Sequence, residues 1–319
     1  MRWGLGGADY SLSLTRQASW DPGRTGRGRV RALARLVRIE HTLFSLPYAY
    51  AGACLACSGC IGLREAVLIG LAVLGLRTAA MAYNNLADMD IDALNPRTRS
   101  RPLVTGAVKP RDAWVLVLLG SVLYYASAVM INKYTMMLSP LPWILAMTYP
   151  HAKRIHWLPH IHLGLVLGLV IFGGSVASLG MIEDSVSRVL AGIPWIYVVA
   201  VALWVAGFDT YYAILDVEFD RRHGVGSIPA RLGAGAALDI SLAMHASTAL
   251  LLALGVVAYN LGFMAALGVV LSALLLAYQH VLLRRRGVAA IPEAFNTNLA
   301  IGIVIAVPIV LDRLVSTGC

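Results

Sequence analysis

The sequence predicts an all-α fold, a polytopic membrane bundle of about nine transmembrane helices. Of the 319 residues, 58% are hydrophobic and only 13% carry a charge, and the mean hydropathy is +0.71. A soluble globular domain is less apolar and carries about twice this share of charged residues. Apolar stretches near the roughly 20 residues that a helix needs to cross a bilayer also recur along most of the chain. These observations place the protein in a membrane.

Nine apolar segments account for this composition. Because unpaired backbone polar groups are costly in lipid, each segment should be a helix. The strands of an outer-membrane barrel would instead show short stretches of alternating polarity. The fourth segment is the shortest of the nine. The segments cover residues 41–61, 64–87, 111–131, 136–150, 160–182, 191–215, 235–258, 261–283 and 292–314.

Basic residues are distributed unevenly about these segments. With the N-terminus assigned to the cytosol, 21 of the 26 lysines and arginines lie on the cytosolic side. This asymmetry follows the positive-inside rule, so the net charge of +9 indicates orientation and contact with anionic lipid. We therefore expect an integral protein of the cell membrane with a cytosolic N-terminus, and no nucleic-acid partner.

The chain divides into a tail and one domain. Residues 1–38 contain Gly, Ser and Arg without a long apolar core, so they do not resemble a cleavable secretory signal. We expect them to form a basic, flexible tail. Residues 39–319 should form one transmembrane domain, because no linker within them is long enough to separate independent units. The sequence leaves the oligomeric state open.

Two polar clusters lie at predicted cytosolic helix ends. Residues four apart share one face of a helix, so each cluster should form a stripe, and two facing stripes would form a cation site. The negative end of a helix dipole disfavours carboxylates, so capping does not account for them. Oxygen ligands of this kind suit Mg²⁺, which binds carboxylates together with substrate phosphates. The clusters are Asn84, Asp88 and Asp92, and Asp209, Asp216 and Asp220, and the second stripe is formed by Tyr212, Asp216 and Asp220.

The loops that follow the two clusters echo each other. Residues 100–106 and 227–233 both fit the pattern S-x-P-x-x-x-G, at similar distances after a D-x-x-x-D. This faint internal repeat indicates pseudo-symmetric halves, which often build a site at their interface.

Basic residues near the clusters fit a phosphate-binding role. Guanidinium groups bind phosphate through paired hydrogen bonds, so acid and base at one mouth indicate a diphosphate held through metal, with cytosolic loops capping the site. Anchoring to lipid headgroups is the alternative, and we favour it for Arg99, Lys109, Arg111 and Arg284 to Arg286. The candidate diphosphate ligands are Arg97, Arg101, Lys153 and Arg222.

Arg77 lies inside a predicted span, where a charge is costly unless it faces the bundle interior. It precedes Asn84 by seven residues, which is two turns along the same face, or about 10 Å deeper by helix rise. A cation at this depth could hold a second, anionic substrate. Snorkelling to the headgroups or an ion pair within the bundle is the alternative.

At the first cluster the chain resembles the UbiA superfamily of intramembrane prenyltransferases. The family motif N-D-x-x-D-x-x-x-D matches residues 84–92, with Asn85 in place of the usual aspartate. Residues 95–103 look like the loop that follows this motif in the family.

Two further elements match the same family. The Y-x-x-x-K element runs from Tyr149 to Lys153, and the motif D-x-x-Y-x-x-x-D-x-x-x-D covers residues 209–220. The four elements occur in the family's order, and the resemblance extends over residues 40–319.

The resemblance implies transfer of a prenyl group from a polyprenyl diphosphate to an aromatic acceptor through an allylic cation, with Mg²⁺ as cofactor. The implied metal ligands are Asn84, Asp88, Asp92, Asp216 and Asp220. The implied diphosphate clamp is Arg97, Arg101, Lys153 and Arg222. Tyr149 and Tyr212 would bind the diphosphate or face the allylic cation, and Asp209 would act as a base that orients the acceptor. Whether Asp90 or water replaces the carboxylate missing at Asn85 stays open.

We expect 4-hydroxybenzoate as the acceptor, prenylated beside its hydroxyl group on the way to a quinone such as ubiquinone, with Arg77 binding its carboxylate. The same donor site could serve geranylgeranylglyceryl phosphate, a dihydroxynaphthoate, a porphyrin or a chlorophyllide, and the sequence does not separate these. A secondary transporter is the alternative from another class. Transport predicts ionisable residues near the membrane midplane rather than at one mouth.

Two residue types near the site have more than one interpretation. Glycines of the fifth segment could line a groove for the prenyl chain or allow close helix packing. Histidines beside Lys153 are interpreted as interfacial polar caps in preference to a zinc cluster. These residues are Gly164, Gly168, Gly173 and Gly174, and His151, His156, His160 and His162.

Overall fold

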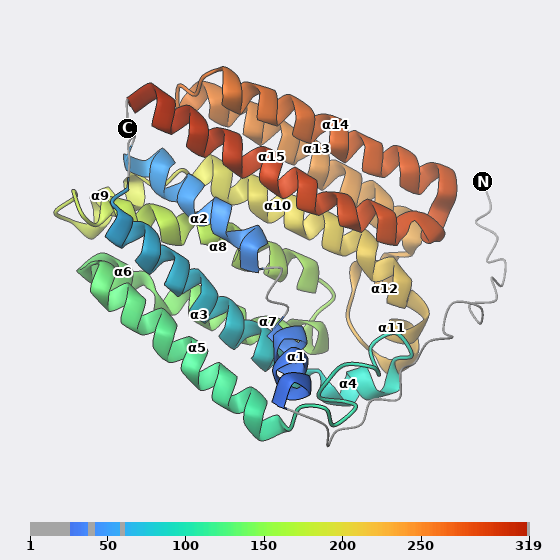
Figure 1. Cartoon of the computed structure of the whole chain (residues 1–319). Helices are drawn as coiled ribbons and strands as arrows, with labels where there is room; N and C mark the ends of the chain where they lie inside the picture. Colours follow the sequence, from blue (N-terminus) through green and yellow to red (C-terminus); the bar gives the residue numbers. More distant parts are fainter. Residues whose placement is uncertain (1–25, 38–41, 58–60, 318–319) are drawn as a thin grey trace.

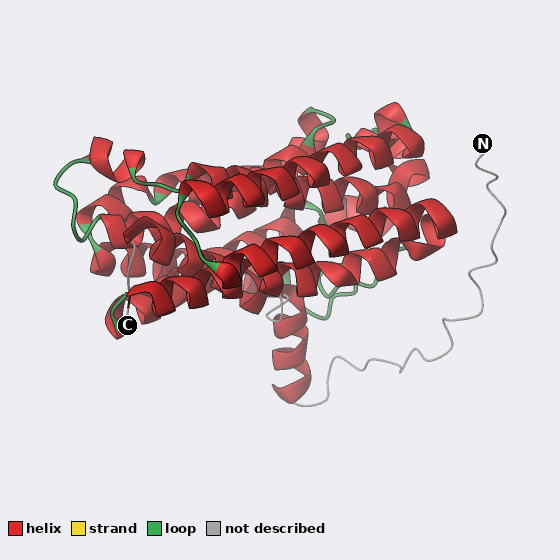
Figure 2. Ribbon diagram, turned by 90° about the horizontal axis from the view of Figure 1, so that it is seen from above, coloured by secondary structure: helices red, strands yellow, loops and turns green. Residues whose placement is uncertain are grey.

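The protein is described by a computed structural model over residues 26–37, 42–57 and 61–317. Every regular element in these ranges is a helix, and the long helices run side by side in one bundle (Figure 1, Figure 2). The predicted all-α fold is confirmed.

The helices of the bundle follow the predicted apolar segments closely. The long helices are α2 (Thr42–Cys57), α3 (Leu63–Ala87), α5 (Pro110–Ile131), α7 (Pro140–Ile155), α8 (Pro159–Leu179), α10 (Trp195–Tyr212), α13 (Ala234–Ala258), α14 (Phe263–Arg286) and α15 (Ile291–Thr317). The short ones are α1 (Gly26–Val37), α4 (Met89–Leu94), α6 (Lys133–Leu138), α9 (Val186–Ala191), α11 (Val217–His223), α12 (Ile228–Leu232) and the 3₁₀ turns η3 (Ala213–Asp216) and η4 (Gly287–Ala290).

Six helical segments of the described chain are long and apolar enough to cross a membrane. The last of them, Phe263–Ser316, contains both α14 and α15, while α2 and α7 have only 16 residues each. The membrane bundle is confirmed, and the count of nine spans stays a prediction.

The fourth predicted segment is displaced in the structure. Residues 136–150 do not form one helix, because α6 ends at Leu138 and α7 begins at Pro140. Proline lacks an N–H group and fits the first position of a helix, so Pro140 begins a new helix rather than continuing the old one. The shift carries α7 five residues further, to Ile155, and places Lys153 in its last turn.

Small residues bring the helices of the bundle close together. A side-chain carbon at Gly75 of α3 would lie 2.7 Å from the carbonyl oxygen of Gly120 in α5. A side-chain carbon at Gly52 of α2 would lie 2.2 Å from the carbonyl oxygen of Ile171 in α8. Such contacts, which stabilise helix pairs in membranes, need residues without side chains.

The glycines of α8 divide between the two interpretations offered for them. Side-chain carbons at Gly164 and Gly168 would meet the backbone of α10, and one at Gly174 would meet the carbonyl of Ala49 in α2. Gly173 has no atom within 4 Å of such a carbon and lines a cavity. Three of the four glycines therefore pack helices, and Gly173 faces open space.

The expected N-terminal tail contains a packed helix. Residues 1–25 and 38 lie outside the described part, but α1 packs against the start of α5 and the end of α3. Leu36 is 1% exposed and contacts a small apolar cluster that includes Leu103 and Val108. Gly26–Val37 of the expected tail thus form an amphipathic helix that buries its apolar face on the bundle.

Candidate active site

One large cavity opens in the described structure at the end of the bundle where α1, α4 and α11 gather (Figure 1). Its volume is about 680 Å³, and it passes from a polar mouth into an apolar interior. Every predicted site residue lines it except Arg222. The lining residues predicted from sequence are Arg77, Asn84, Asp88, Asp92, Arg97, Arg101, Tyr149, Lys153, Asp209, Tyr212, Asp216 and Asp220.

Both acidic clusters lie where a long helix breaks. α3 ends at Ala87, Asp88 takes φ −96° and ψ −1°, and α4 begins with the next residue. α10 likewise passes through η3 into α11. Asp92 and Asp220 thus lie in the first turns of short helices, where the dipole favours negative charge. The expectation of a disfavoured C-terminal end is therefore wrong for Asp92 and Asp220, because a short helix begins directly after each long one, while Asp88 lies at the junction of α3 and α4.

Helical hydrogen bonding nevertheless continues from α3 into α4. The backbone N–H of Asp88 donates to the carbonyl of Asn84 at 3.0 Å, and that of Asp92 donates to the carbonyl of Asp88 at 2.8 Å. Side chains four apart therefore stay on one face, as predicted.

The internal repeat is visible in the backbone. The last glycines of the two S-x-P-x-x-x-G loops, Gly106 and Gly233, have φ values of 77° and 88°, a region that favours glycine. Each loop also contacts the last acid of its cluster, through Arg101 on Asp92 and Ser227 on Asp220. Both loops therefore end at a glycine with a positive φ and contact an acid in the first turn of a short helix, although the second loop is helical and the first is not.

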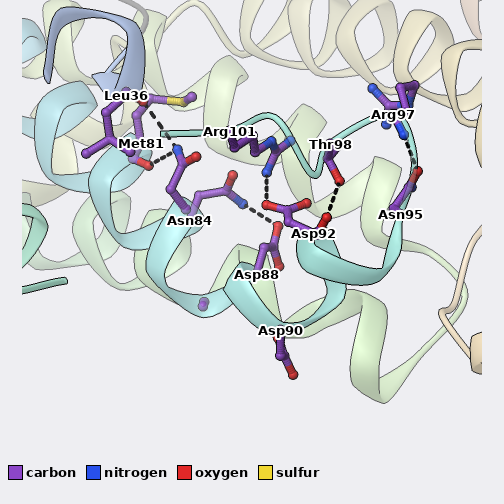
Figure 3. A network of polar contacts seen from close by, with 12 residues as sticks. Leu36, Met81, Asn84, Asp88, Asp90, Asp92, Asn95, Arg97, Thr98 and Arg101 are labelled. Atoms are coloured by element: carbon purple, nitrogen blue, oxygen red, sulfur yellow. Dashed lines mark hydrogen bonds and ion pairs between the residues drawn. The ribbon is translucent and has the colours of Figure 1, made fainter. Parts of the chain in front are cut away.

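Acids of the first cluster are paired with cations that were predicted to bind phosphate. Lys153 Nζ lies 2.7 Å from Asp88 Oδ2. Figure 3 shows the second pair, in which an Arg101 guanidinium nitrogen lies 2.5 Å from Asp92 Oδ2. Burial raises the pKa of Asp92, and the charge of Arg101 opposes this shift. The cations thus neutralise a partly buried acidic surface.

The second cluster is joined to the first by the loop after α4. Arg97 forms an ion pair with Asp216, its Nε donating to Oδ1 at 2.9 Å, and Asn95 donates to the same oxygen at 3.0 Å. The Arg97 guanidinium also lies 5.5 Å from the centre of the Tyr212 ring. The two clusters therefore face one another across the mouth of the cavity.

No three His, Cys, Asp or Glu side chains in the described ranges lie close enough together to hold a metal on their own. The donor set still fits a hard cation that shares its coordination with a phosphate and water. Asp88 Oδ1 is buried and has no hydrogen-bond partner, which is costly for a carboxylate oxygen. A cation or a donor group from a ligand would relieve that cost.

Two residues left open by the sequence point away from this set. Asn85 Nδ2 donates to the carbonyls of Leu36, at 3.2 Å, and Met81, at 2.8 Å, so its amide docks α1 on α3. Asp90 points away from the cluster (Figure 3) and accepts two hydrogen bonds from Arg154, which lower its pKa to about 2. Neither side chain supplies the missing carboxylate.

Deeper in the cavity, an Arg77 guanidinium nitrogen donates to the hydroxyl of Ser45 on α2 at 3.0 Å. Ser45 is 2% exposed, so this contact lies inside the bundle. The predicted intramembrane cation therefore faces the cavity, as its cost in lipid requires.

Asp209 has a partner that the sequence did not reveal. His160 Nδ1 lies 2.6 Å from Asp209 Oδ2, and both residues line the cavity beside Tyr149. The interpretation of His160 as an interfacial cap is wrong, because this side chain is buried. The two residues are 49 positions apart, so no local spacing could have indicated the pair.

Arg222 is the one predicted site residue that the fold directs elsewhere. Its side chain is exposed and faces Glu218 on the outer side of α11, 3.9 Å away. Since Arg222 follows Asp220 by two residues, the helix turns it away from the face that carries the acids.

A comparison with known proteins identifies the chain. The profile of the UbiA prenyltransferase family matches residues 45–302. The chain belongs to the UbiA prenyltransferase family. It is 31% identical to a 4-hydroxybenzoate octaprenyltransferase of Alkalilimnicola ehrlichii over 82% of this chain and 86% of that protein. As a UbiA-family protein it is an enzyme, a prenyltransferase embedded in a membrane, and the transporter alternative is excluded.

Solved UbiA structures show the same fold. The apo structure of a UbiA homolog from Aeropyrum pernix K1 is 54% identical, with a TM-score of 0.83 over 87% of this chain and 99% of that one. A UbiA homolog from Archaeoglobus fulgidus, bound to GPP and Mg²⁺, is 22% identical, with a TM-score of 0.64 over 88% of this chain and 99% of that one. At that identity the second likeness concerns the fold alone.

Proposed function

We propose that this UbiA-family enzyme transfers a prenyl group from a polyprenyl diphosphate to 4-hydroxybenzoate in a Mg²⁺-dependent reaction of quinone biosynthesis. The observation that carries the proposal is the cavity itself, in which a mouth of facing acids and cations leads past Arg77 to an apolar interior. The names of the curated relatives support the acceptor. The Archaeoglobus homolog, bound to GPP and Mg²⁺, supports the donor and the metal.

Donor binding exchanges the partners of the ion pairs at the mouth. The diphosphate replaces carboxylates as the partner of Arg97, Arg101 and Lys153, because phosphate oxygens form strong, charge-assisted hydrogen bonds. The released carboxylates become free to hold the metal. Bound Mg²⁺ supplies charge neutralisation for the departing diphosphate. The residues that would hold it are Asn84, Asp88, Asp92, Asp216 and Asp220.

The acceptor occupies the space between the mouth and Arg77. Arg77 binds its carboxylate, which directs the ring and hydroxyl group toward the donor. Tyr149 and Tyr212 present aromatic faces or hydroxyl groups to the positive charge that develops on the allylic carbon. Asp209 accepts a proton from the acceptor as the new bond forms. The apolar remainder of the cavity holds the prenyl chain.

The distribution of basic residues supports a cell-membrane location with the N-terminus and the mouth of the cavity in the cytosol. Residues 39–319 form the transmembrane domain in this proposal, and α1 lies against its cytosolic end.

Purified protein with geranyl diphosphate and 4-hydroxybenzoate should form ring-prenylated product, and EDTA should abolish this activity until Mg²⁺ is restored. Arg77→Ala should raise the KM for the acceptor and leave the KM for the donor unchanged. Arg222→Ala is a matched control, because this arginine lies outside the cavity, and it should keep full activity. An absence of turnover with every aromatic acid tried would refute the acceptor class.

A further inference from the structure

His160 holds a position that fixes the direction of its hydrogen bonds. It lies in the first turn of α8 directly after Pro159, and only 4% of it is exposed. Its Nδ1 contacts Asp209 Oδ2 at 2.6 Å, a short distance for a nitrogen and an oxygen. Its Nε2 faces the backbone N–H of Ile228 at 3.4 Å.

These two contacts determine the tautomer of the ring. A backbone N–H can only donate, so His160 Nε2 must accept and carries no proton. The ring proton then resides on Nδ1 and is donated to Asp209. The imidazole thus donates through Nδ1 to Oδ2 of Asp209, and one oxygen of that carboxyl group is engaged.

The other oxygen of Asp209 is available to a substrate. No hydrogen bond to Oδ1 occurs among the described residues, and the Asp209 side chain is 23% exposed to the cavity that it lines. Because Oδ2 is hydrogen-bonded to the buried His160 ring, rotation of the Asp209 carboxylate is restricted. His160 therefore sets the direction in which Oδ1 points.

The loop that sets His160 also contacts the acidic mouth. Ser227, which precedes Ile228, donates to Asp220 Oδ2 at 2.7 Å, and the N–H of Gly226 donates to the carbonyl of Lys153 at 2.7 Å. A side-chain carbon at Gly226 would lie 2.3 Å from the carbonyl oxygen of His156, so only glycine fits there. These contacts with Asp220, Lys153 and His156 fix the loop, and so they fix the position of the Ile228 N–H that faces His160.

We infer that His160 is a positioning residue that aims the free oxygen of Asp209 at the acceptor, an inference that rests on the proposed function. In the transfer step, the bond between the allylic carbon and the diphosphate oxygen breaks, and its electron pair leaves with the diphosphate. A bond forms between that carbon and a carbon of the aromatic ring. The proton lost by the acceptor goes to Oδ1 of Asp209.

The test compares two substitutions of His160. His160→Asn keeps an N–H donor near the place of Nδ1, whereas His160→Leu fills the space without a donor. We expect His160→Leu to lower kcat about 10- to 100-fold with the KM for the donor unchanged, and His160→Asn to restore most of the lost rate. Equal losses in both variants, or a loss confined to the KM for the donor, would overturn the assignment.

A double variant separates positioning from a general effect on packing. Asp209→Asn should itself lower kcat about 100-fold or more. Adding His160→Leu to it should lower the rate no further, because His160 acts only through Asp209. Additive losses would show that His160 has an independent role.

A spectroscopic measurement determines the tautomer of His160 in the absence of the aromatic substrate. In protein labelled with ¹⁵N-histidine, the His160 signals, assigned through their absence in His160→Asn, should show a protonated Nδ1 and an unprotonated Nε2. A ring protonated on Nε2 would overturn the inference. If the wild-type enzyme turned over no aromatic acid, the proposed acceptor would be refuted, and this measurement would still decide on His160.

Discussion

Replacing Asn85 with the aspartate usual in the family motif should release α1 from the bundle. Asn85 is 7% exposed, and its amide donates to the carbonyls of Leu36 and Met81. A carboxylate cannot donate, so Asn85→Asp loses both hydrogen bonds. Met81 belongs to the same helix as Asn85, so only the bond to Leu36, worth about 1 kcal/mol, joins α1 to α3. The substitution also leaves buried oxygens facing one another, which costs about 1 to 3 kcal/mol more. The docking of α1 therefore weakens by about 2 to 4 kcal/mol.

The remaining contacts of α1 are about as large as that loss. Burial of Leu36 contributes about 2 kcal/mol. The ion pair between Arg29 and Asp112 contributes about 1 kcal/mol at most, because the arginine side chain is 63% exposed. A helix of 12 residues is marginal on its own in water, so an undocked α1 should also lose its helical hydrogen bonds.

Hydrogen exchange measured by mass spectrometry on the protein in detergent tests this prediction. Exchange of the α1 amides should accelerate about 30-fold or more in Asn85→Asp, since each 1.4 kcal/mol changes the population of the open state about tenfold. Arg29→Ala, the matched control, should accelerate it less than tenfold. The effect should shrink at low pH, where a protonated carboxyl can donate again. Unchanged protection of α1 at neutral pH would refute the role assigned to Asn85.

Three further changes test the site and its surroundings. Asp88→Ala and Asp216→Ala should each lower prenyl transfer more than 100-fold with the thermal unfolding temperature retained, and full activity in both would refute the metal assignment. Gly173→Leu should fill cavity space and lower turnover of long donors while turnover of geranyl diphosphate persists; an equal loss with both donors in competition assays would contradict a chain-binding role. Arg154 holds the pKa of Asp90 at about 2, so its stabilisation is present above the unfolded value of about 4 and disappears as the pH falls from about 4 toward 2. The difference in thermal stability between the protein and Asp90→Asn should follow that window, and a difference that persists at pH 2 would argue against the ion pair.

The sequence predicted the bundle well because its signal is local. Long apolar segments follow directly from the thickness of the membrane, and the structure places helix ends within a few residues of most predicted bounds. Where the helix boundaries differ from the prediction, the cause is a local backbone feature that hydropathy does not detect. Pro140 begins a new helix, and the helix break at Asp88 places Asp92 at the start of a second helix rather than at the end of the first.

The candidate site was predicted residue by residue where spacing or charge carries information. The sequence showed the acids, their four-residue spacing and the neighbouring cations. All of the predicted site residues except Arg222 line one cavity. Arg222 could not be judged from sequence, because its distance from a motif did not show which side of α11 it occupies.

By itself, the sequence determined that the chain spans a membrane, and it predicted that acids and cations gather at one mouth and that Arg77 faces the interior. These properties depend on solvent transfer and helical periodicity, which act over a few turns. Only the tertiary structure decided that Asn95 and Arg97 join the two clusters, that Asn85 docks α1, and that His160 meets Asp209. Each of these contacts joins residues far apart in the chain, and their meeting depends on how whole helices pack.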